Sequence, residues 1–319
     1  MKGKGNAQSL NRVLAPTCGI CGKTPVYYSR VSGTHLCDEH FLSWFEDSVR
    51  TTLCDCAMVE TGDVIAVALS GGKDSSVLLE VLHRIFRGEK MVKLVALTVD
   101  EGITGYREDT VSAAVRLAAR LDVPLRTIAF SDLFGETLDA LVPGREQVAC
   151  SICGTLRRRA LNILAREEGA TKLATGHCLD DESQSVLMNY LRGDLTRTFA
   201  RLPKRVLNSF VPRIKPLRYI SEREVVVYGM LRNVILPLPE CPYTQFALRG
   251  DVRRMLGIME YRYPGTLMKI LRGQEELVKT LSARQDSGTV SICPECGDPS
   301  SGTLCASCTL LNSLGIRKK

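Results

Sequence analysis

The stretch DVIAVALSGGKDSSVLL, residues 63–79, decides the fold. Its first part, 63–69, is a short run of apolar and β-branched residues, which predicts a buried strand. Two glycines follow, and from 75 to 87 the apolar residues recur with the period of a helix. A tight turn between a strand and a helix N-terminus points backbone N–H groups at one place. The stretch therefore predicts a phosphate-binding loop.

The residues of this loop suit a phosphate, although the Walker spacing G-x4-G-K-[ST] lacks its upstream glycine. Gly71 and Gly72 let the backbone turn and approach a phosphate without a Cβ clash. Donors, a cation and a carboxylate surround them: Ser70, Lys73, Asp74 and Ser75. The serines and the lysine can bind phosphate oxygens, and the carboxylate can cap the helix or hold a metal ion. The alternative is a strand–helix turn without a ligand.

The rest of the central block alternates strands with helices. Strands are predicted at 93–99, 125–130 and 171–175, and helices near 107–121, 133–142, 154–168 and 181–192. This alternation predicts an α/β fold with a mostly parallel, doubly wound sheet. Ligands of such sheets bind beyond the C-terminal ends of the strands. DEG at 100–102 and GHCLDD at 176–181 follow strands in the same way as the phosphate loop does.

The composition divides the chain of 319 residues into three blocks. We predict an N-terminal zinc module with a linking helix at 14–58, a catalytic domain at 60–285, and a C-terminal zinc ribbon at 288–319. The helix pattern at 41–59 joins the first block to the sheet, and the pattern at 265–283 joins the sheet to the last block.

Cysteine is abundant, with 13 residues that mostly form C-x2-C pairs. In a chain without a visible secretory signal this pattern favours metal sites over disulfides. Two sets of four have the spacing of zinc ligands: Cys18, Cys21, Cys37 and His40, and Cys293, Cys296, Cys305 and Cys308. Four ligands leave no open position, so both sets predict structural Zn²⁺. His35 is a weaker alternative to His40.

A third set contains three cysteines only. Cys150 and Cys153 lie in ACSICG, and Cys241 in ECPY follows 88 positions after Cys153 (241 − 153). Three thiolates on a [4Fe–4S] cluster leave one iron open for an exogenous ligand. A zinc ion with a fourth ligand from elsewhere and a redox C-x2-C pair are the alternatives, and spacing does not separate the three. Cys54 and Cys56 are interpreted as packing residues.

The charge is uneven along the chain. The net charge is +7, and residues 192–232 alone hold ten Lys/Arg and three Asp/Glu, a surplus of 10 − 3 = 7. Such a segment is typical either of a polyanion-binding surface or of a solvated basic face. No apolar stretch is long enough to span a bilayer and no signal peptide is visible, so we expect a cytoplasmic protein without a membrane partner.

Several motifs occur in one order along nearly the whole chain. They are SGGKDS at 70–75, DEGITGYR at 100–107, C-x2-C-G-x2-R-R at 150–158, GHxxDD at 176–181, LMNYLRGD at 187–194 and ECPY at 240–243. The first resembles the loop of the PP-loop ATP pyrophosphatases, which have the adenine-nucleotide α-hydrolase-like fold. Together the motifs resemble the tRNA 2-thiouridine synthetases of the TtuA/NcsA type, in the TtcA superfamily. One departure is Cys178, where GHNxDD is expected. It is interpreted as a small buried residue, with a fourth cluster ligand or a persulfide carrier as alternatives.

The resemblance implies ATP, Mg²⁺ and a [4Fe–4S] cluster held by Cys150, Cys153 and Cys241. The implied ATP site follows the strands and reaches the cluster: Ala68, Ser70, Gly71, Gly72, Lys73, Asp74, Ser75, Val99, Arg157, Gly176 and Asp181. Asp181, with Asp180 or Asp74, would hold Mg²⁺ or polarise the attack. The predicted catalytic residues are therefore the three cysteines, Asp181 and Arg157, a position where the family often has lysine.

The implied activity is ATP-dependent 2-thiolation of a tRNA uridine. The C2 oxygen attacks the α-phosphate of ATP, and sulfur then displaces AMP. The implied partners are tRNA, a sulfur donor that is a ubiquitin-like thiocarboxylate protein or free sulfide, and a second copy in a homodimer. We predict the wobble uridine as the target. The T-loop uridine and persulfide-based thiolation through Cys150 or Cys153 are alternatives, and a non-catalytic zinc-ribbon RNA-binding protein is the alternative of another class.

Overall fold

A computed structural model describes residues 16–89, 91–194, 210–246, 248–282, 291–300 and 302–316. The chain divides into two compact units, Met1–Trp44 and Phe45–Lys319. Residues 195–209, 15 of the 41 residues in the predicted basic segment, lie outside the described residues, as do the start of the first predicted block, the end of the second and both ends of the third.

The first unit is a small module around a hairpin. Strands β1 (Tyr27–Tyr28) and β2 (His35–Leu36) pair antiparallel. Helix α1 (Asp38–Asp55) begins directly after them and continues into the second unit. Within the module Tyr27 packs on Phe41, with ring centroids 4.8 Å apart. So small an apolar core fits a segment that depends on a bound metal for its stability.

The second unit contains a five-stranded sheet whose strand pairs are all parallel, in the order β5-β4-β3-β6-β7. The strands are β3 (Val64–Ala68), β4 (Lys93–Asp100), β5 (Leu125–Ala129), β6 (Lys172–Ala174) and β7 (Arg213–Ile214). The doubly wound parallel sheet is thus confirmed, with the phosphate-loop strand at its centre. Strand β7 was not predicted, because two residues at a sheet edge carry no periodic pattern.

Helices connect and cover the strands. They are α2 (Lys73–Phe86), α3 (Arg107–Arg120), α6 (Ala149–Glu167), α7 (Leu179–Leu191) and α9 (Glu222–Leu231). Side chains of β4 such as Val95, Leu97 and Val99 form one core with α6, while α2 packs against β3 and α9. The alternating side chains of a strand thereby bury both faces of the sheet.

The single helix predicted at 133–142 is wrong. The structure has two short helices, α4 (Phe130–Phe134) and α5 (Leu138–Leu141). Gly135 follows α4 with φ of 80°, a left-handed conformation that ends a helix. Helix α6 begins five residues before the predicted start at 154, so Cys150 and Cys153 both lie in its first turns.

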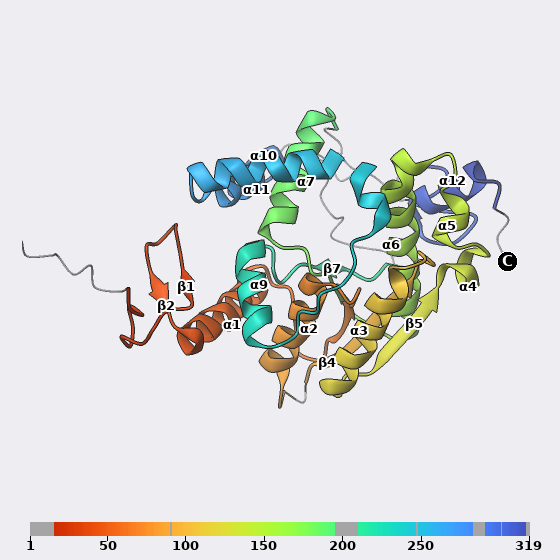
Figure 1. Cartoon of the computed structure of the whole chain (residues 1–319). Coiled ribbons are helices and arrows are strands. Elements are labelled where there is room, and N and C mark those ends of the chain that lie inside the picture. Colours follow the sequence, from red (N-terminus) through yellow and green to blue (C-terminus); the bar gives the residue numbers. More distant parts are fainter. Residues whose placement is uncertain are drawn as a thin grey trace, which may run out of the picture. The chain divides into compact units, whose positions relative to one another are not determined.

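The second unit ends in helices and a small ribbon. Helices α10 (Leu248–Arg262) and α11 (Thr266–Ser282) pack on α7 through Leu179, Met188, Val252, Leu256, Leu267 and Leu271 (Figure 1). Strands β8 (Ser291–Ile292) and β9 (Pro299–Ser300) and helix α12 (Ala306–Ser313) form the ribbon. Leu311 of α12 belongs to the same core as α6. Among the described helices, none has the length and apolar character needed to cross a membrane.

Candidate nucleotide and metal sites

The phosphate loop joins β3 to α2 and its two glycines differ. Gly71 has φ of +85°, and a Cβ there would lie 1.9 Å from the carbonyl oxygen of Thr110. Gly72 has φ of −73°, and a Cβ there would meet only Ser70 Oγ, at 3.5 Å. Backbone conformation and space therefore both require glycine at Gly71. Gly72 instead leaves one face of the loop uncovered.

Two serines hold the loop in shape. Ser75 Oγ accepts a hydrogen bond from Ser70 N at 3.1 Å and donates to Gly72 O at 3.0 Å. Ser70 Oγ lies 3.0 Å from Ser75 Oγ. Gly72 is the N-cap of α2, and no side-chain cap bond forms at that position. The first N–H groups of α2 are thus left for an anion, as the sequence predicts for a phosphate loop.

Lys73 and Asp74 begin α2 and are bound to each other. Lys73 Nζ lies 2.9 Å from Asp74 Oδ2 and 2.8 Å from Glu222 Oε1. Burial lowers the pKa of Lys73, but Asp74 and Glu222 outweigh it and raise that pKa. Asp74 Oδ1 is buried without a hydrogen-bond partner among the described residues, and burial raises the pKa of this carboxyl. An unpartnered carboxylate oxygen is a candidate ligand for a cation.

The loop after β6 brings further carboxylates beside Asp74. A Cβ on Gly176 would lie 2.9 Å from the backbone carbon of Asp74, so this loop touches the start of α2 as only glycine allows. Asp181 accepts hydrogen bonds from Cys178 N at 3.2 Å and Arg249 Nη1 at 3.3 Å. Asp180 accepts from the backbone N–H at the start of α9, and burial raises its pKa to about 6. Asp181 is therefore the better placed of the two for a metal ion.

Cys178 is a packing and capping residue in this structure. It is the N-cap of α7 and is 2% exposed, with its Sγ 3.4 Å from Asp181 Oδ2. Burial raises the pKa of this thiol, and the neighbouring aspartates raise it further. A persulfide carrier needs an accessible thiolate, which Cys178 does not offer. His177 contacts Thr175 Oγ1 through Nδ1 at 2.9 Å and orients the same loop.

Two cysteines of the third set lie on α6, and Cys241 packs against the core to which this helix belongs. Cys153 and Cys241 touch one hydrophobic core, and Cys150 Sγ points at Tyr243 O at 3.7 Å, in η2 (Pro242–Phe246). Cys150 is exposed and Cys153 is buried. Burial raises the pKa of Cys153 to about 11, although Arg157, which donates to its Sγ at 3.1 Å, lowers it.

These thiols are arranged unlike the two four-residue sets. Each four-residue set brings its ligand atoms within 4.8 Å of one another, as a single tetrahedral ion requires. Among the described residues no such group contains Cys150, Cys153 or Cys241. Thiolates that bind different irons of one cluster lie farther apart than thiolates that share one ion. Among the described residues these three cysteines do not form a closed four-ligand set like the other two, and three thiolates are the number that leaves one iron of a [4Fe–4S] cluster open.

A buried carboxylate that sequence reasoning left without a role lies between the loop and the cysteines. Glu101 follows β4 in the motif DEG. It contacts Arg157 Nε at 2.5 Å and Arg107 Nε at 2.7 Å. Arg107 donates to Val99 O and to Ser70 O, the latter at 3.0 Å. Sequence reasoning found the motif, but the pairing of Glu101 with two arginines depends on the fold.

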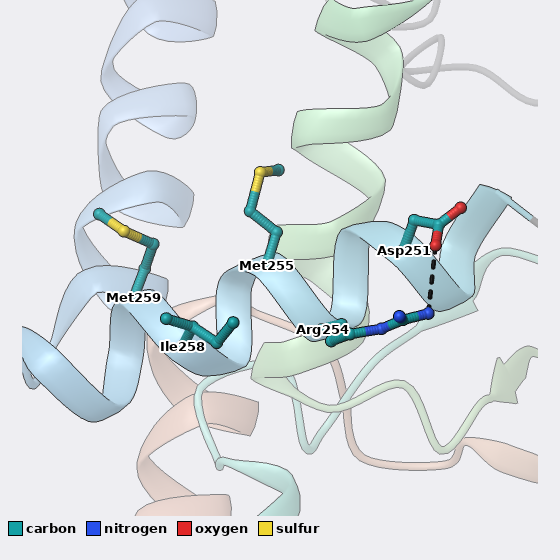
Figure 2. Close-up of a pocket in the computed structure, with 5 residues that line it drawn as sticks. All are labelled: Asp251, Arg254, Met255, Ile258 and Met259. Carbon is teal, nitrogen blue, oxygen red and sulfur yellow. Dashed lines mark hydrogen bonds and ion pairs between the residues drawn. The ribbon is translucent and has the colours of Figure 1, made fainter.

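Arg249 and Glu222 were also missed. Arg249 binds Asp181 from α10, a helix that was not predicted, and Glu222 binds Lys73 from α9. The same helix α10 bears a separate shallow pocket, lined by Asp251, Arg254, Met255, Ile258 and Met259. Figure 2 shows Arg254 turned toward Asp251 along the helix, away from the apolar side chains. None of the predicted site residues lines this pocket.

The comparisons with known proteins agree with this geometry. A family model described as a PP-loop domain matches residues 37–235. The tRNA 2-thiolation protein NcsA of Haloferax volcanii is 38% identical, over 93% of this chain and 98% of its own length. Cytoplasmic tRNA 2-thiolation protein 1 of Bos taurus is 39% identical, over 94% of this chain and 88% of its own.

A solved structure also resembles the chain along most of its length. It is the U34-tRNA thiolase NcsA from Methanococcus maripaludis with its [4Fe-4S] cluster, at 34% identity and a TM-score of 0.80. The match covers 95% of this chain and 98% of that one. With the phosphate loop and the cysteine sites in place, these likenesses show that the chain belongs to the PP-loop tRNA 2-thiolation proteins, a family of tRNA sulfurtransferases.

Proposed function

We propose that the protein is an ATP-dependent tRNA uridine 2-sulfurtransferase that acts at the wobble uridine in the cytoplasm. The observation that carries the proposal is a chain of contacts that joins the cysteine site to the phosphate loop. Arg157 contacts Cys153 Sγ, and Glu101 joins Arg157 to Arg107, which holds the phosphate loop at Ser70 O. The names of the relatives, which refer to U34 and to the cytoplasm, support the position and the compartment.

The loop residues would hold ATP. The N–H groups at the start of α2 and the hydroxyl of Ser70 would bind the β- and γ-phosphates, with Lys73 as the neighbouring cation. Ala68, Gly72, Ser75, Val99 and Gly176 shape the backbone of this site. Asp74 Oδ1, which has no partner in the described part of the chain, and Asp181 would hold Mg²⁺. Arg249, which donates to Asp181 at 3.3 Å, would then compete with the ion for this carboxylate.

The reaction requires two displacements. The C2 oxygen of uridine attacks the α-phosphate, the bond to pyrophosphate breaks, and an adenylated base forms. Arg157 would stabilise the charge that develops on the phosphate. Sulfur then attacks C2, and AMP leaves with the former C2 oxygen. An uncharged carbonyl oxygen is a poor leaving group and AMP is a good one, which is why ATP and sulfur chemistry share one site.

Cys150, Cys153 and Cys241 would hold the cluster, and the two four-residue sets would each hold a zinc ion. When bound, a [4Fe–4S] cluster on three thiolates supplies an iron with room for an exogenous sulfur ligand. The exposed side of this site at Cys150 leaves a path for the sulfur donor. The donor, a thiocarboxylate protein or free sulfide, and the homodimer are part of the proposal. The two zinc modules, with the basic segment 192–232, would bind tRNA.

The test locates the sulfur atom. Anaerobic protein is incubated with unmodified tRNA, ATP and sulfide or a thiocarboxylated carrier, and nuclease fragments are weighed by mass spectrometry. We expect one sulfur-for-oxygen exchange in the anticodon fragment. Sulfur in the T-loop fragment would move the target to that uridine. Thiolation that persists in iron-free protein would favour the persulfide route. Absence of both sulfur and AMP release would favour a non-catalytic RNA-binding protein.

A further inference from the structure

Glu101 is one of the most deeply buried charged residues of the second unit. It is 1% exposed and lies just beyond the C-terminal end of β4, beside the phosphate loop that follows β3. Its two oxygens face different arginines. Oε1 lies 2.5 Å from Arg157 Nε and Oε2 lies 2.7 Å from Arg107 Nε. The two arginines compensate the hydration that a carboxylate loses on burial at such a position.

On one side of Glu101, Arg107 is bound to the nucleotide loop. It is 3% exposed and donates to Ser70 O at 3.0 Å and to Thr110 Oγ1 at 2.8 Å. The carbonyl of Thr110 is also the group over which Gly71 passes, at a distance that only glycine tolerates. Arg107 therefore fixes the first residues of the loop, and Glu101 in turn holds the guanidinium of Arg107.

On the other side, Arg157 is bound to the cysteine site. Its Nη2 donates to Cys153 Sγ at 3.1 Å, and Cys153 lies one turn earlier on α6. Arg157 is half exposed, unlike Arg107, so a part of its guanidinium can reach a ligand. Without Glu101 the long side chain of Arg157 would be free to turn toward solvent, since its other contact is with a single sulfur atom.

The charges of this group are not balanced within it. Two guanidiniums face one carboxylate, which leaves one positive charge at the boundary between the loop and the cysteines. Phosphate on one side and a cysteine thiolate on the other can both use that charge. A ligand that binds at one side therefore changes the electrostatic potential at the other side.

We infer that Glu101 is a positioning residue that couples ATP binding to the state of the cysteine site, by holding Arg157 between the two. The inference rests on the proposed function for the identity of the ligands, ATP and an iron–sulfur cluster. Glu101 touches neither ligand and acts through the two arginines. Its removal leaves two neighbouring cations that repel each other, so the more exposed of the two, Arg157, leaves its position.

The test uses Glu101→Gln, which keeps the shape of the side chain and removes its charge. ATP affinity is measured by calorimetry on zinc-loaded, cluster-free protein. We expect the dissociation constant to rise about tenfold, the size of one lost charge-assisted contact. In cluster-loaded protein we expect ATP to perturb the visible circular dichroism of the wild type and to leave that of Glu101→Gln unchanged.

A matched control is Glu46→Gln. Glu46, on α1, is a partly buried carboxylate between two arginines, with Arg84 Nε at 2.9 Å and Arg232 Nη2 at 2.6 Å. Arg84 lies in the last turn of α2, at the opposite end of the helix from the phosphate loop, and Arg232 follows the last residue of α9. Glu46→Gln should lower thermal stability as Glu101→Gln does, and it should leave ATP affinity within twofold of the wild type. If Glu46→Gln weakens ATP binding equally, the effect is general destabilisation and the inference fails.

A double-mutant cycle with Arg157→Ala identifies the route of the effect. If Glu101 acts through Arg157, adding Glu101→Gln to Arg157→Ala changes ATP affinity by less than twofold. Full additivity, or wild-type ATP affinity in Glu101→Gln alone, overturns the inference. Should Glu101→Gln not fold, Glu101→Asp, which keeps the charge and shortens its reach, is measured in the same way. A wild-type protein that shows this coupling and yet gives no thiolated tRNA would refute the proposed function and leave the inference standing.

Discussion

The four-residue sets and the three-cysteine set use the same side chains for opposite purposes. In the four-residue sets the ligand atoms crowd together, as with Cys37 Sγ and His40 Nδ1 at 3.3 Å and Cys296 Sγ and Cys305 Sγ at 3.5 Å. A metal ion there has no position left for a substrate. The three-cysteine set is open, and an arginine from the nucleotide side touches one of its thiols. The number of ligands and their spacing separate a structural metal from a reactive one.

One thiol in each four-residue set has a lowered pKa, whereas the pKa of Cys153 is raised. Desolvation raises the pKa of Cys18 and of Cys293, but backbone N–H groups around them outweigh it and bring both to about 6. Burial brings the pKa of Cys153 to about 11 instead. Cys18 and Cys293 thus each offer their set one thiolate at neutral pH, while Cys153 keeps its proton until a metal displaces it.

The largest expected effect tests the openness of the three-cysteine set. Cys150→Ser should remove the iron of anaerobically prepared protein and lower tRNA thiolation by more than about 100-fold, since even an outer-shell change costs 10–100-fold. Zinc content, measured by elemental analysis of the same sample, should not change. Full thiolation by Cys150→Ser would show that the three cysteines do not form one functional site.

The second-largest effect tests whether the C-terminal four-residue set holds a structural zinc ion. Cys305→Ser removes a buried ligand and should release one of two zinc ions per chain. Because Leu311 of the ribbon packs into the core with α6, the melting temperature should fall by roughly 10 °C, several kcal/mol of unfolding free energy. Calorimetry with and without added zinc measures the shift. Unchanged melting with one zinc lost would mean that the ribbon adds nothing to the main core.

The third effect tests the difference in thiol pKa. In zinc-loaded, cluster-free protein, the rate at which iodoacetamide labels Cys153 should rise about tenfold per pH unit from pH 7 toward its pKa of about 11. The thiolate is the nucleophile, and a raised pKa keeps its fraction small until high pH. Mass spectrometry of tryptic peptides follows each site separately. A labelling rate that levels off near pH 7 would contradict the raised pKa of Cys153.

The smallest expected effect concerns a hydrogen bond from an arginine to a thiol of the C-terminal four-residue set. Arg159 Nη1 donates to Cys308 Sγ at 3.6 Å, from the same helix α6 that carries Cys150 and Cys153. Arg159→Ala should speed zinc release to a chromophoric chelator by a few-fold, because one charge-assisted contact to a ligand is lost. Arg158→Ala, one residue away on the helix, serves as the control. Equal zinc-release rates from Arg159→Ala and Arg158→Ala would show that Arg159 has no specific effect on zinc release.

Much of the fold and of the metal sites could be predicted because their signals are local. The strand and helix around Gly71 and the C-x2-C pairs each lie within a few residues, so periodicity and spacing suffice. The break at Gly135 was missed because a glycine inside an apolar pattern does not reveal its φ. Glu101, Arg107 and Arg249 were missed because each acts through partners from other strands and helices. The contact of Cys241 with α6 could be expected only from the resemblance to a family.

The distance in sequence between Cys153 and Cys241 has a further consequence. A cofactor held by all three cysteines closes a loop of 88 residues (241 − 153), which includes strands β6 and β7 and helices α7 and α9. Such a closure limits the unfolded chain as a disulfide does, by about 4 kcal/mol in a chain-entropy model. Oxygen that destroys the cluster would then also cut a crosslink. Aerobic protein should therefore unfold more readily than anaerobic protein, and a protease that cuts the unfolded chain should digest it faster.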